Sequence, residues 1–298
     1  VKLNNTRFPL SYYYMGRIEM YGYRNITKIL KFLVIKIYDI DKAYSIFVGD
    51  NIKALNYFNH SINLMPDHAE TKFFINAITK SENLKTLPES LVIDKYNIDS
   101  RKYFELYSQF DDVFIIITDS VEQHIQYRKK TYNILDIGCG DGKLSRYFHK
   151  LDMVRRIDGI DISHKRIEEC NDYQYMKAPL YDNLYNMSIN KFLKESDKTY
   201  DIIVASRVFS DIGELDEIFN GCREKMNKGA IFVFNIQPPA DDNKKLLYNV
   251  NILYALHNYN YIKEVVQKSD LEIINSFCFL LSESNIGIQF IVRKLKTD

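Results

Sequence analysis

Apolar residues recur at two different spacings along this chain of 298 residues, and the change in spacing divides it into two regions. From Asn25 to Ile78 they follow the intervals of three and four positions that mark one face of a helix, as in Ile26, Ile29 and Leu30. Beyond about Tyr132, short apolar runs alternate with amphipathic segments, which is typical of a parallel sheet with crossover helices. The pattern predicts an all-helical region followed by an α/β domain.

Seven apolar runs of the second region are predicted to be strands, and three segments between them are predicted to be helices. The strands are expected at residues 133–137, 156–162, 185–187, 200–206, 230–236, 271–281 and 287–292. The helices are expected at residues 143–150, 165–171 and 214–226. Because a short polar turn separates the last two strands, we expect these two to pair antiparallel.

The helical region contains a short pattern of small, aromatic and helix-ending residues. Ala54, Phe58 and Pro66 have the spacing of the second helix and turn of a tetratricopeptide repeat, and the segment from Asp67 to Ile78 resembles the first helix of a following repeat. An amphipathic helical hairpin explains the same pattern, because about one and a half repeats match. The polar stretch from Thr79 to Ser90 is predicted to be a linker.

Composition excludes several classes of protein. A formal charge of +1 gives no overall electrostatic reason to expect a nucleic-acid or membrane partner. The most apolar stretch, residues 29–38, is interrupted by two lysines and is far shorter than the roughly 20 residues that cross a bilayer, and no secretory signal is evident, so we expect a cytoplasmic protein. The four cysteines are far apart, which argues against a zinc site or a disulfide framework, and we expect no metal.

The strongest motif is a predicted strand that runs into a glycine-rich turn and a helix. In the run NILDIGCGDG, residues 133–142, the glycines at 138, 140 and 142 allow positive φ angles and let the backbone approach a ligand closely. Asp161 ends the next predicted strand, 25 residues after Asp136, where a carboxylate can accept hydrogen bonds from both hydroxyls of a ribose. Together these features predict a cofactor that contains a nucleoside.

Two cofactor classes use such a turn, and details of the motif separate them. A dinucleotide site wants a third glycine at the position of Lys143, and the Asp136 carboxylate would sit poorly beside a pyrophosphate but suits a cationic amino group. The string LDIGCGDG resembles the first motif of class I S-adenosylmethionine methyltransferases, and Gly-Ile-Asp161-Ile-Ser163 resembles their second. The resemblance implies a Rossmann-like sheet of seven strands with an antiparallel last pair, and S-adenosylmethionine as cofactor.

The resemblance also implies which residues bind the cofactor. These are Asp136, Gly138, Cys139, Gly140, Asp161, Ile162, Met187, Ser188 and Ser206. Ser188 stands where the family usually has an aspartate facing the adenine amino group, which weakens the expected contact. Arg207 replaces an acid close to the expected sulfonium; two cations 4 Å apart repel by roughly 4 kcal/mol at an effective dielectric of about 20, so Arg207 must point outward if the cofactor binds. Arg207 is then either a clamp for an anionic substrate or a surface residue.

The likeness extends to predicted bacterial methyltransferases that carry tetratricopeptide repeats before the catalytic domain. It rests on the segment from Tyr200 to Leu215 and on residues 103–111, which resemble that family's pre-catalytic helix. We therefore expect a repeat-like region at 1–90 and a methyltransferase domain at 91–298, with pre-catalytic helices at 91–130. The Asn-Pro-Pro-aromatic motif of amino-methylating enzymes is missing after the fourth strand, which disfavours that subclass.

Methyl transfer needs little acid–base machinery, so the sequence names no catalytic residue. Arg207, Asp211 and Tyr107 are the candidates for contact with the substrate, and plain packing roles explain them equally well. The expected function is methylation of a protein or small molecule, with any protein partner on the helical region. The alternatives are a catalytically weak binding or scaffold protein and a dinucleotide oxidoreductase.

Overall fold

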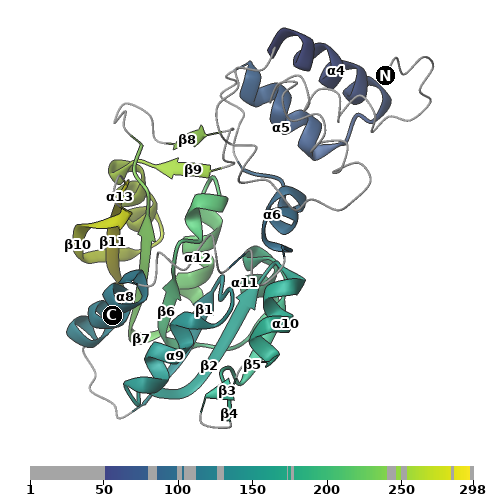
Figure 1. The fold of residues 1–298 in the computed structure, drawn as a ribbon. Coiled ribbons are helices and arrows are strands. Elements are labelled where there is room, and N and C mark those ends of the chain that lie inside the picture. The colour runs from purple at the N-terminus through teal and green to yellow at the C-terminus, as the bar shows by residue number, and fades with distance from the viewer. Residues whose placement is uncertain are drawn as a thin grey trace. The chain divides into compact units, whose positions relative to one another are not determined.

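The computed structural model describes residues 51–79, 86–98, 103, 112–125, 131–172, 174–175, 178–239, 246–249, 254–282 and 285–295 (Figure 1). The chain divides into two compact units. The first comprises Val1–Lys95 with Tyr248–Tyr254, and the second comprises Tyr96–Leu247 with Ala255–Asp298. The helical segment predicted at 25–50 lies outside the described residues, as does Tyr107.

Two helices make up most of the described part of the first unit. Helix α4 (Asn51–Leu64) and helix α5 (Ala69–Ile78) pack through Phe58 and Phe74, whose rings stack with centroids 5.4 Å apart. Ala54 and Phe58 are both fully buried, as their spacing on one helix face predicts. These two helices fit a repeat and a simple hairpin equally, so the repeat stays a prediction. Helix α6 (Glu89–Tyr96) begins at the end of the predicted linker.

The second unit is built on a seven-stranded sheet in the order β10-β11-β7-β6-β1-β2-β5. Its strands are β1 (Tyr132–Ile137), β2 (Val154–Asp161), β5 (Asn183–Asn186), β6 (Tyr200–Ala205), β7 (Met226–Ile236), β10 (Leu271–Ser282) and β11 (Asn285–Lys294). The pairs from β7 to β5 are parallel, and β11 is antiparallel to both β10 and β7. The predicted seven strands and the antiparallel final pair are confirmed.

Helices cover both faces of this sheet, which explains why its central strands are apolar at nearly every position. One core lies between the sheet and helices α11 (Ile189–Glu195), α12 (Asp216–Lys225) and α13 (Tyr259–Lys268). The other lies between the sheet and helices α8 (Asp112–His124), α9 (Lys143–Lys150) and α10 (His164–Asp172). A 3-10 turn, η3 (Phe209–Asp211), follows β6. Two further pairs, β3 (Gln174–Tyr175) with β4 (Ala178–Pro179) and β8 (Leu246–Asn249) with β9 (Tyr254–His257), form separate two-stranded sheets.

Some element boundaries differ from those predicted. Helix α12 ends at Lys225, and β7 begins at Met226, four residues before its predicted start. The strand passes through Gly229, which has a φ of 77°. Helices α11 and α13 were not predicted. For α13 a signal existed, because Asn258 caps the helix by accepting a hydrogen bond from Asn260 N.

The topology directs attention to one edge of the sheet. From β1 the chain moves to β2 on one side and returns later to β6 on the other, so the strand order reverses beside β1. Ligands of open α/β sheets bind at such a reversal, outside the carboxyl ends of the strands.

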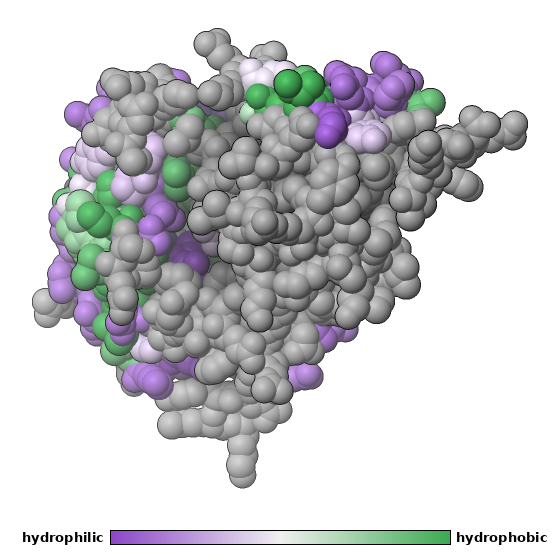
Figure 2. Space-filling model, turned by 45° about the horizontal axis from the view of Figure 1, so that its top comes forward, coloured by the Kyte–Doolittle hydropathy of each residue, from purple (hydrophilic) through white to green (hydrophobic). Residues whose placement is uncertain are grey.

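The surface of the described residues is mixed in character. On the left of Figure 2 hydrophobic and hydrophilic residues lie side by side. The β10–β11 hairpin contributes exposed apolar side chains, with Leu280 73% and Ile286 53% exposed. No helix within the described residues is long and apolar enough to span a bilayer.

Candidate functional site

The glycine turn follows β1 directly and is tied to the end of β2. Gly138 and Gly140 have φ angles of 65° and 55°, which only glycine adopts readily. The backbone N–H groups of Gly138 and Cys139 both donate to the Ile160 carbonyl, at 2.8 and 3.0 Å. Gly142, at a φ of 77°, is the N-cap of α9. The strand–turn–helix context predicted for this motif is therefore present.

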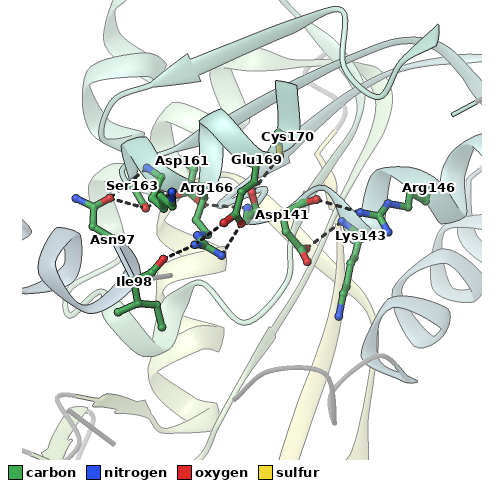
Figure 3. Close-up of polar contacts among 12 residues, drawn as sticks. Asn97, Ile98, Asp141, Lys143, Arg146, Asp161, Ser163, Arg166, Glu169 and Cys170 are labelled. Carbon is green, nitrogen blue, oxygen red and sulfur yellow. Dashed lines mark hydrogen bonds and ion pairs between the residues drawn. The ribbon is translucent and has the colours of Figure 1, made fainter. Parts of the chain in front are cut away.

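Asp161, the last residue of β2, joins the glycine turn to the start of α10. One carboxylate oxygen accepts the Gly140 N–H at 3.0 Å, and the other accepts the Ser163 N–H at 2.8 Å (Figure 3). Burial raises the pKa of Asp161 to about 6, although both backbone hydrogen bonds oppose the rise. Each carboxylate oxygen can accept a second hydrogen bond, so the group retains capacity for two ligand hydroxyls.

Asp136 is a buried residue of β1, two positions before the glycine turn. Its side chain is 1% exposed, and it accepts a hydrogen bond from the Tyr181 hydroxyl at 2.8 Å. Burial raises the pKa of Asp136 to about 7, against the opposing effect of that hydrogen bond. A cation placed beside this carboxyl group would favour its ionised form.

The other predicted cofactor residues follow the neighbouring strands at the same edge. The Ile162 carbonyl accepts Asn186 Nδ2 at 3.0 Å, and Met187 N donates to the Asp161 carbonyl at 3.2 Å. Ser188 is the N-cap residue of α11, and its hydroxyl makes no capping hydrogen bond. Ser206 follows β6. The structure thus brings the nine predicted residues together at the carboxyl ends of the adjacent strands β6, β1, β2 and β5.

Two of the three candidates for substrate contact follow β6. Arg207 has a φ of 58°, and its backbone N–H donates to Asn235 Oδ1 at 2.8 Å. Burial raises the pKa of the Tyr103 hydroxyl, and the positive charge of Arg207 is one of the weaker influences that oppose the rise. Asp211, in η3, is 6% exposed and accepts the Tyr96 hydroxyl at 2.6 Å. The third candidate, Tyr107, is not among the described residues.

Several residues at the site were missed by sequence reasoning. Tyr103 lies over the turn, with its hydroxyl 3.0 Å from where a Cβ on Gly140 would be. Arg166 lies beneath that ring, and Cys170 donates through its thiol to the Gly140 carbonyl at 3.0 Å. Tyr103 is the first residue of the segment 103–111, which resembles a pre-catalytic helix. That resemblance was the sequence signal that could have placed Tyr103 near the site. For Arg166 the sequence offered none.

Three polar side chains, each with a buried polar atom, form a row on one face of the sheet beside the turn. Asn235 of β7 is in register with Gln289 of β11, and Ser206 follows Ala205, which is in register with Phe234 and Ile137. Ser206 Oγ, Asn235 Nδ2 and Gln289 Oε1 are buried, and no described residue bonds to any of the three atoms. The row therefore begins next to Gly138 and crosses β6, β7 and β11. At the usual spacing between strands, its length is about 10 Å.

Comparison with known proteins identifies the domain. A family model described as a methyltransferase domain matches residues 128–275, which contain β1, the glycine turn, Asp161 and the β6 segment. The second unit is therefore similar to methyltransferase domains. The match favours S-adenosylmethionine over a dinucleotide as the cofactor of this site.

Two curated relatives match this domain over part of their length. The mitochondrial ubiquinone biosynthesis O-methyltransferase of Saccharomyces cerevisiae is 27% identical over 128 residues, which cover 42% of this chain and 40% of that protein. Malonyl-[acyl-carrier protein] O-methyltransferase 1 of Ilyobacter polytropus is 26% identical over 146 residues, covering 48% of this chain and 53% of that protein. The chain thus spans about half the length of these relatives.

Solved structures share the fold of the methyltransferase domain. A Leishmania major S-adenosylmethionine-dependent methyltransferase has a TM-score of 0.57 at 11% identity, covering 69% of this chain and 82% of that one. Magnesium protoporphyrin IX methyltransferase from Synechocystis, solved with S-adenosylhomocysteine, has a TM-score of 0.53 at 13% identity, covering 69% of this chain and 99% of that one.

The residues present fit S-adenosylmethionine. Gly138 and Gly140 add no side chain of their own to the turn, although Val208 and Tyr103 pack close to them, and Asp161 has acceptor capacity for ribose hydroxyls. The raised pKa of Asp136 marks a carboxyl group that a cationic partner would ionise. The buried Ser206 hydroxyl, without a partner among the described residues, lies at the neighbouring strand end.

Proposed function

We propose that this protein transfers a methyl group from S-adenosylmethionine to a small-molecule acceptor that binds at the carboxyl ends of β6 and β7. The observation that carries the proposal is the hydrogen bond from Gly140 N to the Asp161 carboxylate. This hydrogen bond brings the glycine turn and Asp161 together. A ligand that contains both an amino-acid tail and a sugar requires these two motifs to be adjacent. The bound cofactor supplies an activated methyl group on a sulfonium.

The chain's own residues have mainly holding roles in this proposal. Asp161 accepts the ribose hydroxyls, the backbone at Gly138 and Gly140 lies against the amino-acid tail, and Asp136 provides the negative charge for the ammonium. The backbone and side chain of Met187 and Ser188, which follow β5, border the adenine. Alignment of acceptor and methyl group contributes most of the rate in such a reaction, so no catalytic base is needed.

The polar row is the proposed place for the acceptor. Ser206, Asn235 and Gln289 carry no charge, and the atoms that no described residue bonds are one hydroxyl, one amide donor and one amide acceptor. Leaving each group buried and unpaired costs about 1–3 kcal/mol, which a ligand with matching hydrogen bonds would offset. The row therefore favours an uncharged polar acceptor. The curated relatives named above are called O-methyltransferases, which supports an oxygen as the methylated atom.

Calorimetric titration with S-adenosylmethionine, S-adenosylhomocysteine and, as comparator, nicotinamide dinucleotide tests the cofactor assignment. We expect micromolar binding of the first two and none of the third. Asp161→Ala should abolish binding while circular dichroism stays unchanged. Asp172→Ala, an exposed carboxylate at the end of α10, is the matched control and should bind normally. Undiminished affinity in the Asp161 variant would refute the ribose role.

A second candidate is a binding protein with a catalytically weak methyltransferase domain, acting through its helical surface. Two observations favour it: Ser188 stands in place of an acid, and the protein's own side chains cover the turn. Val208 Cγ2 lies 2.5 Å from where a Cβ on Gly138 would be, and Tyr103 covers Gly140. A folded protein that binds neither S-adenosylmethionine nor its product supports this candidate. The tetratricopeptide repeat, a protein partner on it and a cytoplasmic location remain predictions.

A further inference from the structure

Arg166 is a buried cation that the methyl-transfer reaction does not use. Its side chain is 1% exposed although it lies on α10, a short helix on which most residues are polar. Burying a guanidinium is costly unless charge and hydrogen bonds compensate it. Here one guanidinium nitrogen lies 2.7 Å from a carboxylate oxygen of Glu169, and another donates to the second oxygen at 3.0 Å.

Two further contacts of the Arg166 guanidinium reach residues that precede the seven-stranded sheet in the sequence. Its Nη2 atom donates to the Ile98 carbonyl at 2.7 Å (Figure 3). Its guanidinium carbon lies 4.0 Å from the centroid of the Tyr103 ring, within the range of a cation–π contact. The planar group therefore joins α10 to Ile98 on one side and to Tyr103 on another.

A second set of contacts fixes the same segment at the start of α10. The Ser163 hydroxyl donates to Asn97 Oδ1 at 2.8 Å, and Lys165 N donates to the same oxygen at 3.3 Å. Tyr96 donates to Asp211 after β6. We call the described residues Tyr96, Asn97, Ile98 and Tyr103 the strap. The strap is therefore bonded to the loops after both β2 and β6, on either side of the glycine turn.

The strap ends on the cofactor site itself, because the Tyr103 hydroxyl lies over Gly140. From this geometry we infer that Arg166 is a positioning residue, which holds the strap across the glycine turn and so slows release of S-adenosylmethionine. The inference rests on the proposed function, since it needs the cofactor to bind at this turn. A cofactor bound at this turn would lie beside Tyr103, so loss of the Arg166 contacts should ease its release.

Dissociation of tritiated S-adenosylmethionine, chased with unlabelled cofactor, measures the effect. Losing a charge-assisted hydrogen bond and the ring contact should make Arg166→Met release the cofactor about 10- to 100-fold faster, with an association rate within about twofold of the unaltered protein. Arg166→Lys retains the charge but loses the planar guanidinium. Its rate of cofactor release should lie between those of the unaltered protein and Arg166→Met. Hydrogen exchange of peptides covering Asn97 and Ile98 should increase in both variants even without cofactor.

Two neighbouring glutamates provide a matched pair. Glu169→Gln removes the charge that compensates Arg166 and should speed dissociation. Glu168→Gln breaks the exposed ion pair with His164 on the same helix and should leave dissociation unchanged. If Arg166→Met does not fold, Asn97→Ala tests the strap, because it removes the acceptor for Ser163 without disturbing the buried cation.

The outcomes separate the strap from the proposed function. If the unaltered protein binds no S-adenosylmethionine, the proposed function fails. If it binds, and the folded Arg166→Met and Asn97→Ala proteins release the cofactor at the unaltered rate, the strap inference alone is overturned. It is also overturned if affinity falls only through slower association, because a retaining strap acts on release.

Discussion

Replacing Asp136 by asparagine should make the protein more stable and a poorer binder of its cofactor. Burial raises the pKa of Asp136 from 3.8 to about 7. The folded state therefore holds a proton that the unfolded chain releases, and stability is lost as the pH rises from about 4 to about 7. With those two values, the loss attributable to Asp136 between pH 5 and pH 8 is about 2.5 kcal/mol. Asparagine does not titrate, so the variant should lack this loss.

Urea unfolding at pH 5 and pH 8, followed by circular dichroism, measures the effect. The free energy of unfolding of Asp136→Asn relative to the unaltered protein should rise by about 2–3 kcal/mol between the two pH values. The amide can still accept from the Tyr181 hydroxyl, so the local packing is retained. Affinity for S-adenosylmethionine at pH 8 should fall about 10- to 100-fold, the cost of one charge-assisted contact.

Asp158 supplies the control for this experiment. It is also fully buried, but it accepts from Asn183, Tyr200 and Lys198 at 2.8, 2.9 and 3.0 Å. Asp158→Asn should therefore destabilise the protein at pH 8, because it removes the negative charge that the half-buried Lys198 pairs with. If Asp136→Asn shows the pH dependence of the unaltered protein, the raised pKa is refuted. If it binds cofactor normally, its role toward the ammonium is refuted.

Three further outcomes are expected. Affinity for S-adenosylmethionine, measured by calorimetry, should weaken as the pH falls from 7 to 5, because Asp161, with a pKa of about 6, becomes protonated and loses acceptor capacity; constant affinity would contradict this. A disulfide reagent that reacts with thiols should modify Cys278 in the folded protein and the three buried cysteines only after unfolding in urea. Rapid reaction of two thiols in the folded protein would contradict the burial of the other three cysteines. Gly159→Ala should cost about 1–3 kcal/mol in urea unfolding, because the new Cβ would lie 2.9 Å from Leu184 and Tyr181 atoms; unchanged stability would show that these side chains can move aside.

The parts of the site that the sequence predicts are those whose residues are neighbours in the chain. The glycine turn is one run of ten residues, and its strand–turn–helix geometry follows from local backbone preferences. Asp161 was predictable because it closes the next parallel strand, and parallel strands end at the same edge of a sheet. The sheet itself follows from the alternation of apolar runs and amphipathic segments.

The parts that the sequence does not predict depend on residues far apart in the chain. Asn97 and Ser163 are 66 positions apart, and Ile98 and Arg166 are 68 apart. An arginine on a polar helix is expected in solvent, and nothing local indicates that Glu169 and an aromatic ring cover it. The polar row likewise depends on the register between Asn235 and Gln289, which only the folded sheet defines.

A comparison of two buried aspartates separates structural from functional carboxylates in this domain. Asp158 and Asp136 lie on the adjacent strands β2 and β1, and both are at most 1% exposed. Asp158 is surrounded by three donors, one of them a lysine, so its burial is compensated within the protein. For Asp136 the Tyr181 hydroxyl is the side-chain donor among the described residues, and its pKa is raised accordingly. A carboxyl group that is costly to ionise in the folded protein gains from a cation supplied from outside, and the ammonium of S-adenosylmethionine is such a cation. The incomplete compensation of Asp136 is therefore the physical reason to assign it to the cofactor rather than to the fold.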